Sequence, residues 1–384
     1  MKAAVLGFGT VGVGVYKMLE AAPGLEPGPV FVRPGKEDQP YKVSDLDKIL
    51  SDPEVDAVVE VMGGVDPAFE YVSAALRACK HVVTSNKALV AARGLELDAL
   101  ARQNGVAFLF SAACGGAIPF LHNLALAAES DKIVFVGGIL NGTTNFMLDA
   151  MQSDRSQYAQ ALAQAQRLGY AEADPSADVS GLDALRKIML ACAVAWGKLP
   201  VDGLLHEGIE SLTADDVSHF MDKGLVCRLL ASASLSEDGK LSAYVQPMLF
   251  PAGAPETSVK RNFNLAKYRG ANSGEILLMG QGAGRFPTAS AVLRDLSDIR
   301  SGRRTMFPAG LQAANADNTC ARCRYYIRLP KAASDALPFS VSEDCGDTLR
   351  GMTEPISVLT MHETAAKLRG DGLSVFFAAV EGKI

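Results

Sequence analysis

The N-terminal segment constrains the fold more than any other part of the chain. An apolar run at residues 2–6 leads directly into Gly7, Gly9 and Gly12 of the pattern G-F-G-T-V-G, and a helical pattern follows to about Glu20. This pattern alone is weak, but one that follows a strand and opens a helix is typical of dinucleotide-binding turns. The sequence therefore predicts a strand, a tight turn and a helix whose first N–H groups face an anion.

Further apolar runs alternate with helical patterns over the first third of the chain. The runs lie at residues 30–32, 55–62, 81–85 and 106–112, and the helical patterns lie at 66–79 and 88–103. Strands that alternate with helices indicate a parallel sheet covered on both faces. We therefore expect an α/β Rossmann-type dinucleotide-binding domain at residues 1–130.

The pattern changes after residue 131. A strand is expected at 132–140, helices at 143–152, 156–168 and 180–196, a hairpin at 225–250, a strand at 275–280 and a long helix after the glycines of 280–284. This mixture predicts an α+β domain at residues 131–305, with residues 285–320 packing back on the first domain. Residues 321–384 contain strand patterns at 324–330 and 373–381 around a helical segment, and they are too few for a large core of their own.

Composition excludes several classes of protein. The net charge of −6 argues against a nucleic-acid partner, and no apolar run approaches the ~20 residues that cross a bilayer. The N-terminus lacks the features of a signal peptide, so we expect the seven cysteines to be free thiols in the cytoplasm. Cys320 and Cys323 form a lone C-x-x-C pair, which leaves chance spacing, a redox role and a metal role open.

The glycine-rich turn predicts the cofactor contacts. Gly7 permits the turn, Gly9 allows the backbone to approach a pyrophosphate, and Gly12 allows close packing of helix and strand. The pyrophosphate is expected at the helix N-terminus, beside Thr10 and Val11.

The end of the second strand indicates which nicotinamide cofactor is bound. An acid there would bind a ribose 2′-hydroxyl, but the chain has Arg33 and no acid before Glu37. An arginine suits a 2′-phosphate, which favours NADP, with NAD and a merely solvated arginine as the alternatives.

Two segments carry candidate catalytic groups. Lys87 lies just beyond a predicted parallel strand, where such sheets bind ligands, and Ser85 belongs to the same segment. Asp183 and Lys187 are four residues apart and share one face of the predicted helix. A surface ion pair is the alternative, but the apolar continuation IMLACAVAW indicates a buried helix and favours a functional pair.

Seven ordered motifs within residues 1–305 resemble the homoserine dehydrogenase family: GFGTVG, VEVMGG, HVVTSNKALVA, GGAIPF, GGILNGTTNFML, LGYAEADPSADVSGLDALRK and GQGAGRFPTASAV. The resemblance implies a dinucleotide-binding domain, a catalytic and dimerisation domain, and a homodimer or homotetramer. It also implies NAD(P)-dependent interconversion of L-homoserine and L-aspartate 4-semialdehyde, in the biosynthesis of threonine, methionine and isoleucine.

The resemblance also implies roles for individual residues. Lys187 matches the proton donor to the aldehyde oxygen, Lys87 a second active-site lysine near nicotinamide, and Asp183 the acid that positions the reacting hydroxyl. The remaining matches are to groups around the substrate ammonium, namely Gly169, Glu172 and Asp178, and to a cofactor contact, Gly284. The chemistry is consistent, because hydride addition to an aldehyde develops alkoxide charge that an ammonium stabilises and protonates.

Two parts of the chain depart from the family pattern. The carbonyls of Cys114, Gly116 and Ile118 match the family's ligands for a monovalent cation, but Ser111 replaces the family's glutamate and leaves this ion site in doubt. The C-terminal region resembles a shortened, degenerate ACT domain, so inhibition by threonine is open.

Two other functions remain as alternatives. A thiol-dependent semialdehyde dehydrogenase would use Cys114 with His122 as its base, although a small core cysteine is the simpler interpretation. A non-enzymatic NADP-binding regulator would share the fold but lack Lys87, Asp183 and Lys187, and the chain has all three.

Overall fold

The computed structural model describes residues 1–382, which form two compact units. The first unit comprises residues 1–133, 189–199 and 270–313, and the second comprises residues 134–188, 200–269 and 314–384. Among residues 1–382, no helix is long and apolar enough to cross a membrane.

The first unit contains a six-stranded sheet of order β3-β2-β1-β4-β5-β6. All of its strand pairs are parallel, as the alternation of strands and helices predicts. The strands are β1 (Lys2–Leu6), β2 (Glu26–Phe31), β3 (Lys42–Val43), β4 (Val55–Glu60), β5 (His81–Thr84) and β6 (Phe108–Leu109). The last strand is shorter than the predicted 106–112, because the chain turns into the 3-10 helix η1 (Ser111–Ala113).

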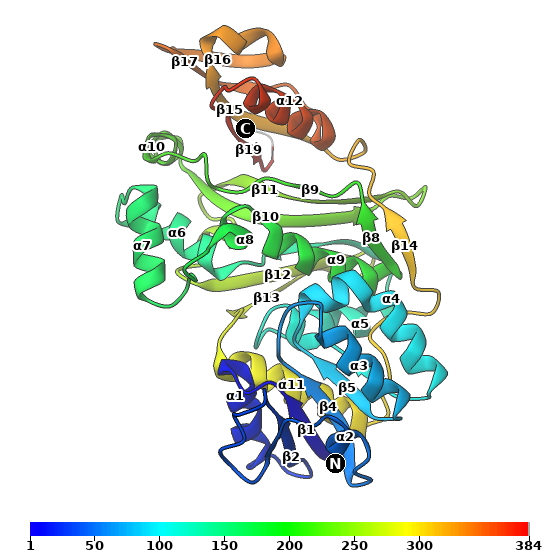
Figure 1. Ribbon diagram of the computed structural model, residues 1–384. Coiled ribbons are helices and arrows are strands. Elements are labelled where there is room, and N and C mark those ends of the chain that lie inside the picture. The colour runs from blue at the N-terminus through cyan, green and yellow to red at the C-terminus, as the bar shows by residue number, and fades with distance from the viewer. Residues whose placement is uncertain (383–384) are drawn as a thin grey trace. The chain divides into compact units, whose positions relative to one another are not determined.

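Helices of the first unit pack around this sheet (Figure 1). They are α1 (Thr10–Leu19), α2 (Asp47–Leu50), α3 (Ala68–Arg77), α4 (Lys87–Gln103), α5 (Phe120–Ser130) and α11 (Arg285–Arg300). Helices α1 and α11 lie in direct contact at Gly14, where an added Cβ would stand 2.8 Å from Arg285. The first unit also includes β13 (Gly274–Gln281), so a distant part of the sequence completes it.

The second unit is built on strands of order β12-β7-β10-β11-β19-β15-β17-β16. Their bounds are β7 (Ile133–Ile139), β10 (Leu225–Leu235), β11 (Leu241–Pro251), β12 (Phe263–Gly270), β15 (Arg322–Pro330), β16 (Phe339–Cys345), β17 (Thr348–Thr353) and β19 (Phe376–Val380). Shorter strands are β8 (Lys198–Asp202), β9 (Leu205–His206), β14 (Gln312–Asn315) and β18 (Ile356–Ser357). The predicted hairpin is confirmed, because β10 and β11 pair antiparallel along their whole length.

Six helices accompany these strands among the described residues. They are α6 (Gly142–Ser153), α7 (Tyr158–Arg167), α8 (Ser176–Val179), α9 (Leu182–Trp196), α10 (Ala214–Asp222) and α12 (Val358–Gly370). Ser180 is the C-cap residue of α8, and α9 begins two residues later at Leu182.

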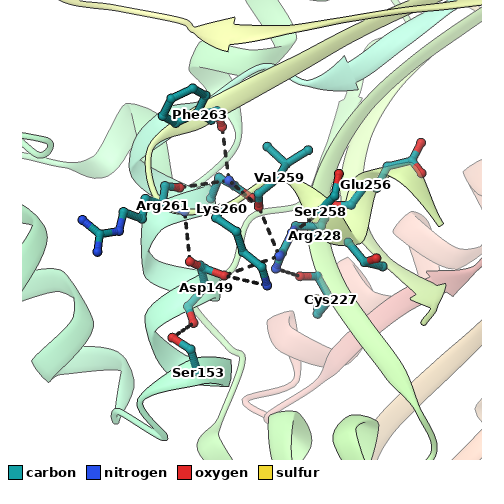
Figure 2. A network of polar contacts seen from close by, with 12 residues as sticks. Asp149, Ser153, Cys227, Arg228, Glu256, Ser258, Val259, Lys260, Arg261 and Phe263 are labelled. Atoms are coloured by element: carbon teal, nitrogen blue, oxygen red, sulfur yellow. Dashed lines mark hydrogen bonds and ion pairs between the residues drawn. The ribbon is translucent and has the colours of Figure 1, made fainter. Parts of the chain in front are cut away.

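A buried polar network fixes α6 against the loop before β12 (Figure 2). Arg228 is 0% exposed and donates to the carbonyls of Cys227, Glu256 and Val259. Asp149 of α6 accepts from the backbone N–H of Arg261 at 2.9 Å. Because each buried charge has polar partners, this network holds α6 in one position.

The C-terminal segment forms one half of the second unit's sheet. Its order is β15, the 3-10 helix η3 (Lys331–Ala336), β16, β17, β18, α12 and β19, and its core includes Tyr325, Ile327 and Phe377 beneath α12. Figure 1 shows α12 lying beside β15 and β19. The β16–β17 hairpin was not foreseen from the sequence. The resemblance to an ACT domain stays a prediction.

Candidate functional site

The glycine-rich turn has the geometry that close approach of a ligand requires. Gly7 has φ of 99°, a left-handed conformation that favours glycine. An added Cβ at Gly12 would stand 2.1 Å from the carbonyl oxygen of Gly7, whereas at Gly9 it would meet no atom within 4 Å. The turn therefore packs tightly against the protein at Gly12, whereas the space beside Gly9 is open to a ligand.

No side-chain cap accepts a hydrogen bond from the first backbone N–H groups of α1. Its cap residue is Gly9, which offers no side-chain hydrogen bond, and no acid lies in the first turn. Thr10 is exposed and Val11 is half-buried. Uncapped N–H groups and the helix dipole favour an anion here, so the residues present fit the pyrophosphate of a dinucleotide.

Arg33 follows β2 at the edge of the same turn region. Its side chain is exposed, and within residues 1–382 it has no ion-pair or hydrogen-bond partner. The guanidinium is thus available to a phosphate, and no carboxylate of residues 1–382 neutralises it.

A hydrogen-bond network that sequence reasoning missed orders the loops after β4 and β5. Glu60 is 0% exposed and accepts from the backbone N–H of Met62 at 2.7 Å and from the hydroxyl of Thr84 at 2.5 Å. That hydroxyl accepts from the N–H of Asn86, whose side chain caps α4 by accepting from Leu89 N–H at 3.1 Å. Since Asn86 is the cap, the network determines where the next helix begins.

The network places two of the predicted residues. Ser85 lies between Thr84 and Asn86, and its N–H donates to the carbonyl of Glu60 at 3.2 Å. Lys87 is the first residue of α4, half-buried, directly after the carboxyl end of β5. Gly284, with φ of 122°, is the cap residue of α11 and has no side-chain cap.

In the second unit, Asp183 and Lys187 form a close pair near the start of α9. Lys187 Nζ lies 2.7 Å from Asp183 Oδ2 and donates to the carbonyl of Leu140 at 2.6 Å. Both residues are 8% exposed, which excludes the solvated surface pair considered from the sequence. The pair is held at the carboxyl end of β7 by this contact.

Asn141, the cap of α6, links two of the predicted acids. Its Nδ2 donates to Asp178 Oδ1 at 2.7 Å and to Asp183 Oδ2 at 2.8 Å, while its Oδ1 accepts from Thr144 N–H. Burial raises the pKa of Asp178, and the hydrogen bond from Asn141 opposes that rise. The structure therefore brings Asp178, Asp183 and Lys187 together through an asparagine that the sequence analysis did not single out.

Gly169 and Glu172 lie in the loop between α7 and α8. Gly169 has φ of 74°, and Glu172 is exposed, with no ion-pair or hydrogen-bond partner for its carboxylate in the described part of the chain. The chain turns at Asp174-Pro175, where Asp174 Oδ1 accepts from Ser176 N–H at 3.0 Å. The loop is thus ordered by Asp174, while Glu172 faces solvent.

The segment around Ser111 contains a carboxylate that the sequence analysis missed. Asp295 of α11 is 0% exposed, and its Oδ2 accepts from the N–H of Ser111 at 2.8 Å. Burial raises the pKa of Asp295 to about 7. The Ser111 hydroxyl contacts the sulfur of Met306 at 3.6 Å. The sequence did contain a signal for this buried acid, because Asp295 lies on the same helix face as the apolar residues Val292, Leu296 and Ile299.

The candidate metal and thiol groups are arranged as follows. The carbonyl of Ile118 accepts from Phe120 N–H at 2.7 Å, and Gly116 has φ of 53°. Cys114 is buried, and His122 Nδ1 lies 2.8 Å from Asp298 Oδ2. Among residues 1–382, no cluster of three His, Cys, Asp or Glu side chains could hold a metal ion. The ring of His122 is thus engaged by a carboxylate.

An open glycine turn on a parallel sheet, with a buried carboxylate–lysine pair elsewhere in the chain, defines a nicotinamide-dinucleotide-dependent oxidoreductase of a small polar substrate. The chain belongs to the homoserine dehydrogenase family. The family model described as homoserine dehydrogenase matches residues 119–297, and the model of its NAD binding domain matches residues 7–111.

Relatives agree with this assignment over most of their length. The chain is 39% identical to a homoserine dehydrogenase of Synechocystis over 316 residues, which cover 78% of this chain and 73% of the relative. It is 41% identical to that of Corynebacterium glutamicum, with 76% and 70% covered.

Solved structures agree as well. A homoserine dehydrogenase from Thiobacillus denitrificans matches with a TM-score of 0.87 at 30% identity, covering 99% of this chain and 98% of that one. A hyperthermophilic archaeal homoserine dehydrogenase mutant in complex with NADPH matches with a TM-score of 0.68 at 25% identity, covering 79% and 98%.

Proposed function

We propose that the chain interconverts L-homoserine and L-aspartate 4-semialdehyde, and that Asp183 and Lys187 act on the reacting oxygen. The observation that carries this proposal is the buried pair itself, with 2.7 Å between Asp183 Oδ2 and Lys187 Nζ. A bound nicotinamide cofactor accepts the hydride in one direction and supplies it in the other. The family membership supports the reaction, and the buried pair supports the choice of its acid–base groups.

Lys187 would exchange the proton of the substrate hydroxyl. During homoserine oxidation the neutral amine of Lys187 accepts that proton, and during aldehyde reduction the ammonium returns it. The carbonyl of Leu140 and the carboxylate of Asp183 fix Nζ in one position. This orientation favours transfer, because an amine with two anchored contacts has little freedom to turn away.

Asp178 is the best candidate for holding the substrate ammonium. It is half-buried, and one of its oxygens accepts a hydrogen bond from Asn141, which also donates to Asp183. We place Glu172 and Gly169 as further contacts from the exposed loop. Lys87, at the start of α4, is proposed to contact nicotinamide and substrate, and Gly284 the cofactor.

NADP is proposed as the preferred cofactor, with NAD as the alternative. The support is an exposed, unpaired Arg33 after β2, and one relative was solved with NADPH. The test is the ratio of kcat/KM for NADPH to that for NADH in the wild type and in Arg33→Ala. The variant is expected to lose most of the preference for NADPH, and a wild type that prefers NADH would contradict the proposal.

A monovalent cation is not expected to be required. Ser111 supplies no charge at the position of the family's glutamate, and its hydroxyl is turned to the Met306 sulfur. The carbonyls of Cys114, Gly116 and Ile118 alone are weak ligands, so the fit is poor. Activity in tetramethylammonium buffer should match that in sodium or potassium buffer, and a strict need for either ion would contradict this.

Three broader assignments are also proposed. The chain is expected to act in the cytoplasm as a homodimer or homotetramer, because the family resemblance implies this assembly. Its C-terminal segment is proposed as an ACT-like region, supported by its βαββαβ-type order with η3 in place of the first helix. A titration of activity with threonine would test the ACT-like region, and sedimentation of the purified chain would test the assembly.

The decisive assay for the function is homoserine-dependent reduction of NADP. We expect activity that needs homoserine and that thiol reagents do not abolish, since Cys114 is buried. A phosphate-dependent reaction with the semialdehyde, blocked by thiol reagents, would favour the thiol-dependent dehydrogenase instead. Cofactor binding without turnover of either substrate would favour the regulator.

A further inference from the structure

A cavity in the second unit lies apart from the groups assigned to the reaction. It has a volume of about 380 Å³, within the roughly 300–1,000 Å³ of small-molecule pockets. Its walls come from α10, from the β10–β11 hairpin and from the C-terminal strands. Each of these elements belongs to the same compact unit.

Strand register explains how the cavity forms. Side chains alternate between the two faces of a strand, so Arg324 and Tyr326 of β15 share one face, and Tyr325 and Ile327 share the other. The face with Tyr325 is buried beneath α12. The face with Tyr326 pairs in register with Met352 of β17 and lines the cavity.

The lining combines apolar walls with an excess of positive charge. Phe220, Leu249, Met352 and Val380 contribute apolar surface. The ring of Phe220 packs edge-on against Tyr326, with 4.8 Å between the ring centroids. Tyr326 donates its hydroxyl to Asp216 at 2.9 Å, so its polar end is satisfied.

Three cations line the cavity: Lys223, Arg324 and Arg350. Glu343 is the one acid among the lining residues, so the local charge is positive in a chain of net charge −6. Within residues 1–382, none of the three cations has a carboxylate within 4.0 Å.

An arginine beside the cavity has an acid partner, whereas Arg350 in its lining has none among the described residues. Arg328, on the same face of β15, is paired with Asp216 of α10 at 3.0 Å. Arg350, by contrast, has a buried Nε that finds no acceptor in the described part of the chain. Arg350 lines the cavity without an acid partner, so a ligand carboxylate would pair with the part of its guanidinium that faces the cavity.

We propose that this cavity binds a small monocarboxylate with an apolar body, its carboxylate on Arg350 and Arg324 and its apolar part against Tyr326 and Phe220. An arginine fork matches a carboxylate in shape as well as in charge. The aromatic and aliphatic walls supply the area that an apolar body would bury. The site does not depend on the reaction proposed above.

Isothermal titration of the full chain with 3-phenylpropanoate tests the site. The uncharged amide of the same acid is the ligand control, and Lys367→Gln, an exposed cation on α12, is the charge control. We expect saturable binding of one acid per chain. Arg350→Gln should raise the Kd about tenfold or more, as expected for a hydrogen bond between charged groups.

Lys223→Gln keeps the test valid if Arg350→Gln does not fold. Lys223 is exposed, so its replacement should leave the fold intact and still weaken binding a few-fold by lowering the local charge. The proposal is overturned by any of three results. These are the absence of saturable binding, equal binding of the amide, or cavity variants that bind as well as Lys367→Gln.

Discussion

Replacement of Asn141 by aspartate would test how the acidic cluster is held. The wild-type amide donates to Asp178 Oδ1 at 2.7 Å and to Asp183 Oδ2 at 2.8 Å. Aspartate caps helices as well as asparagine does, so Asn141→Asp keeps the cap of α6. It replaces the donor by a third carboxylate, and therefore removes both hydrogen bonds and adds a negative charge beside the two acids.

The magnitude follows from those two bonds. Each joins a neutral amide to a carboxylate and contributes about 1.5 kcal/mol, so their loss is worth about 3 kcal/mol. If both bonds serve the transition state, kcat/KM for homoserine falls about 100-fold near neutral pH. Three carboxyl groups at such distances cannot all be ionised, so the variant should also recover activity as the pH is lowered.

The assay is the reduction of nicotinamide with homoserine, over a range of pH. Asn141→Ala is the companion variant, because it removes the donor and the cap together. It should be about 1 kcal/mol less stable than Asn141→Asp to denaturant, through loss of the cap. A value of kcat/KM for Asn141→Asp within about twofold of wild type at every pH would refute this account of the cluster.

Three further predictions concern stability and binding. Asp295 has a pKa of about 7 in the folded protein against about 3.9 in the unfolded chain. The free energy of unfolding therefore falls as the pH rises between these two values, because the unfolded chain ionises this group first. Denaturant titration should therefore show Asp295→Asn gaining on the wild type by a few kcal/mol between pH 5 and pH 8, and a constant difference would contradict the assignment. Arg369 pairs with the buried Glu207 at 2.7 and 2.8 Å. Two residues further on, the N–H of Ile209 donates to the carbonyl of Val179, which follows Asp178. Arg369→Gln should lower stability and raise KM for homoserine a few-fold with kcat preserved, and unchanged values of both would disprove the link. Gly12→Ala should destabilise the chain, because its Cβ would stand 2.1 Å from a carbonyl oxygen, whereas Gly9→Ala should only weaken NADPH binding. Calorimetry and cofactor titration separate the two variants, and equal effects on stability would contradict the geometry.

Local sequence signals predicted the parts of the molecule that local physics determines. The glycine spacing at residues 7–12 requires a tight turn wherever it follows a strand, and the structure has that turn after β1. The spacing of Asp183 and Lys187 requires one helix face, and the two groups meet at 2.7 Å. Both features depend on residues close together in sequence.

The contacts that complete the cluster could not be predicted in this way. Asn141 is 37 residues from Asp178 and 42 from Asp183, so no spacing rule joins them. Glu60 and Thr84 are 24 residues apart and meet only because β4 and β5 are neighbours in the sheet. An Asn in N-G-T-T before a helix signals a cap but says nothing about what its amide donates to.

The β16–β17 hairpin was missed for a related reason. Its residues 339–345 are mostly exposed, and the alternation of apolar and polar residues at 339–342 ends at Glu343 and Asp344, so the pattern is too short to mark a strand. Its place in the sheet comes from pairing with β17, which is a tertiary contact. The cavity lined by Arg350 was invisible for the same reason.

The central claim is that Lys187 exchanges a proton with the substrate oxygen. Lys187→Ala is therefore compared with Arg186→Ala, which removes a neighbouring, half-buried cation from the same helix. We expect Lys187→Ala to lose nearly all turnover with homoserine while its Kd for NADPH stays unchanged, and Arg186→Ala to remain active. Near-normal turnover of Lys187→Ala would contradict the claim, whatever the other variants show.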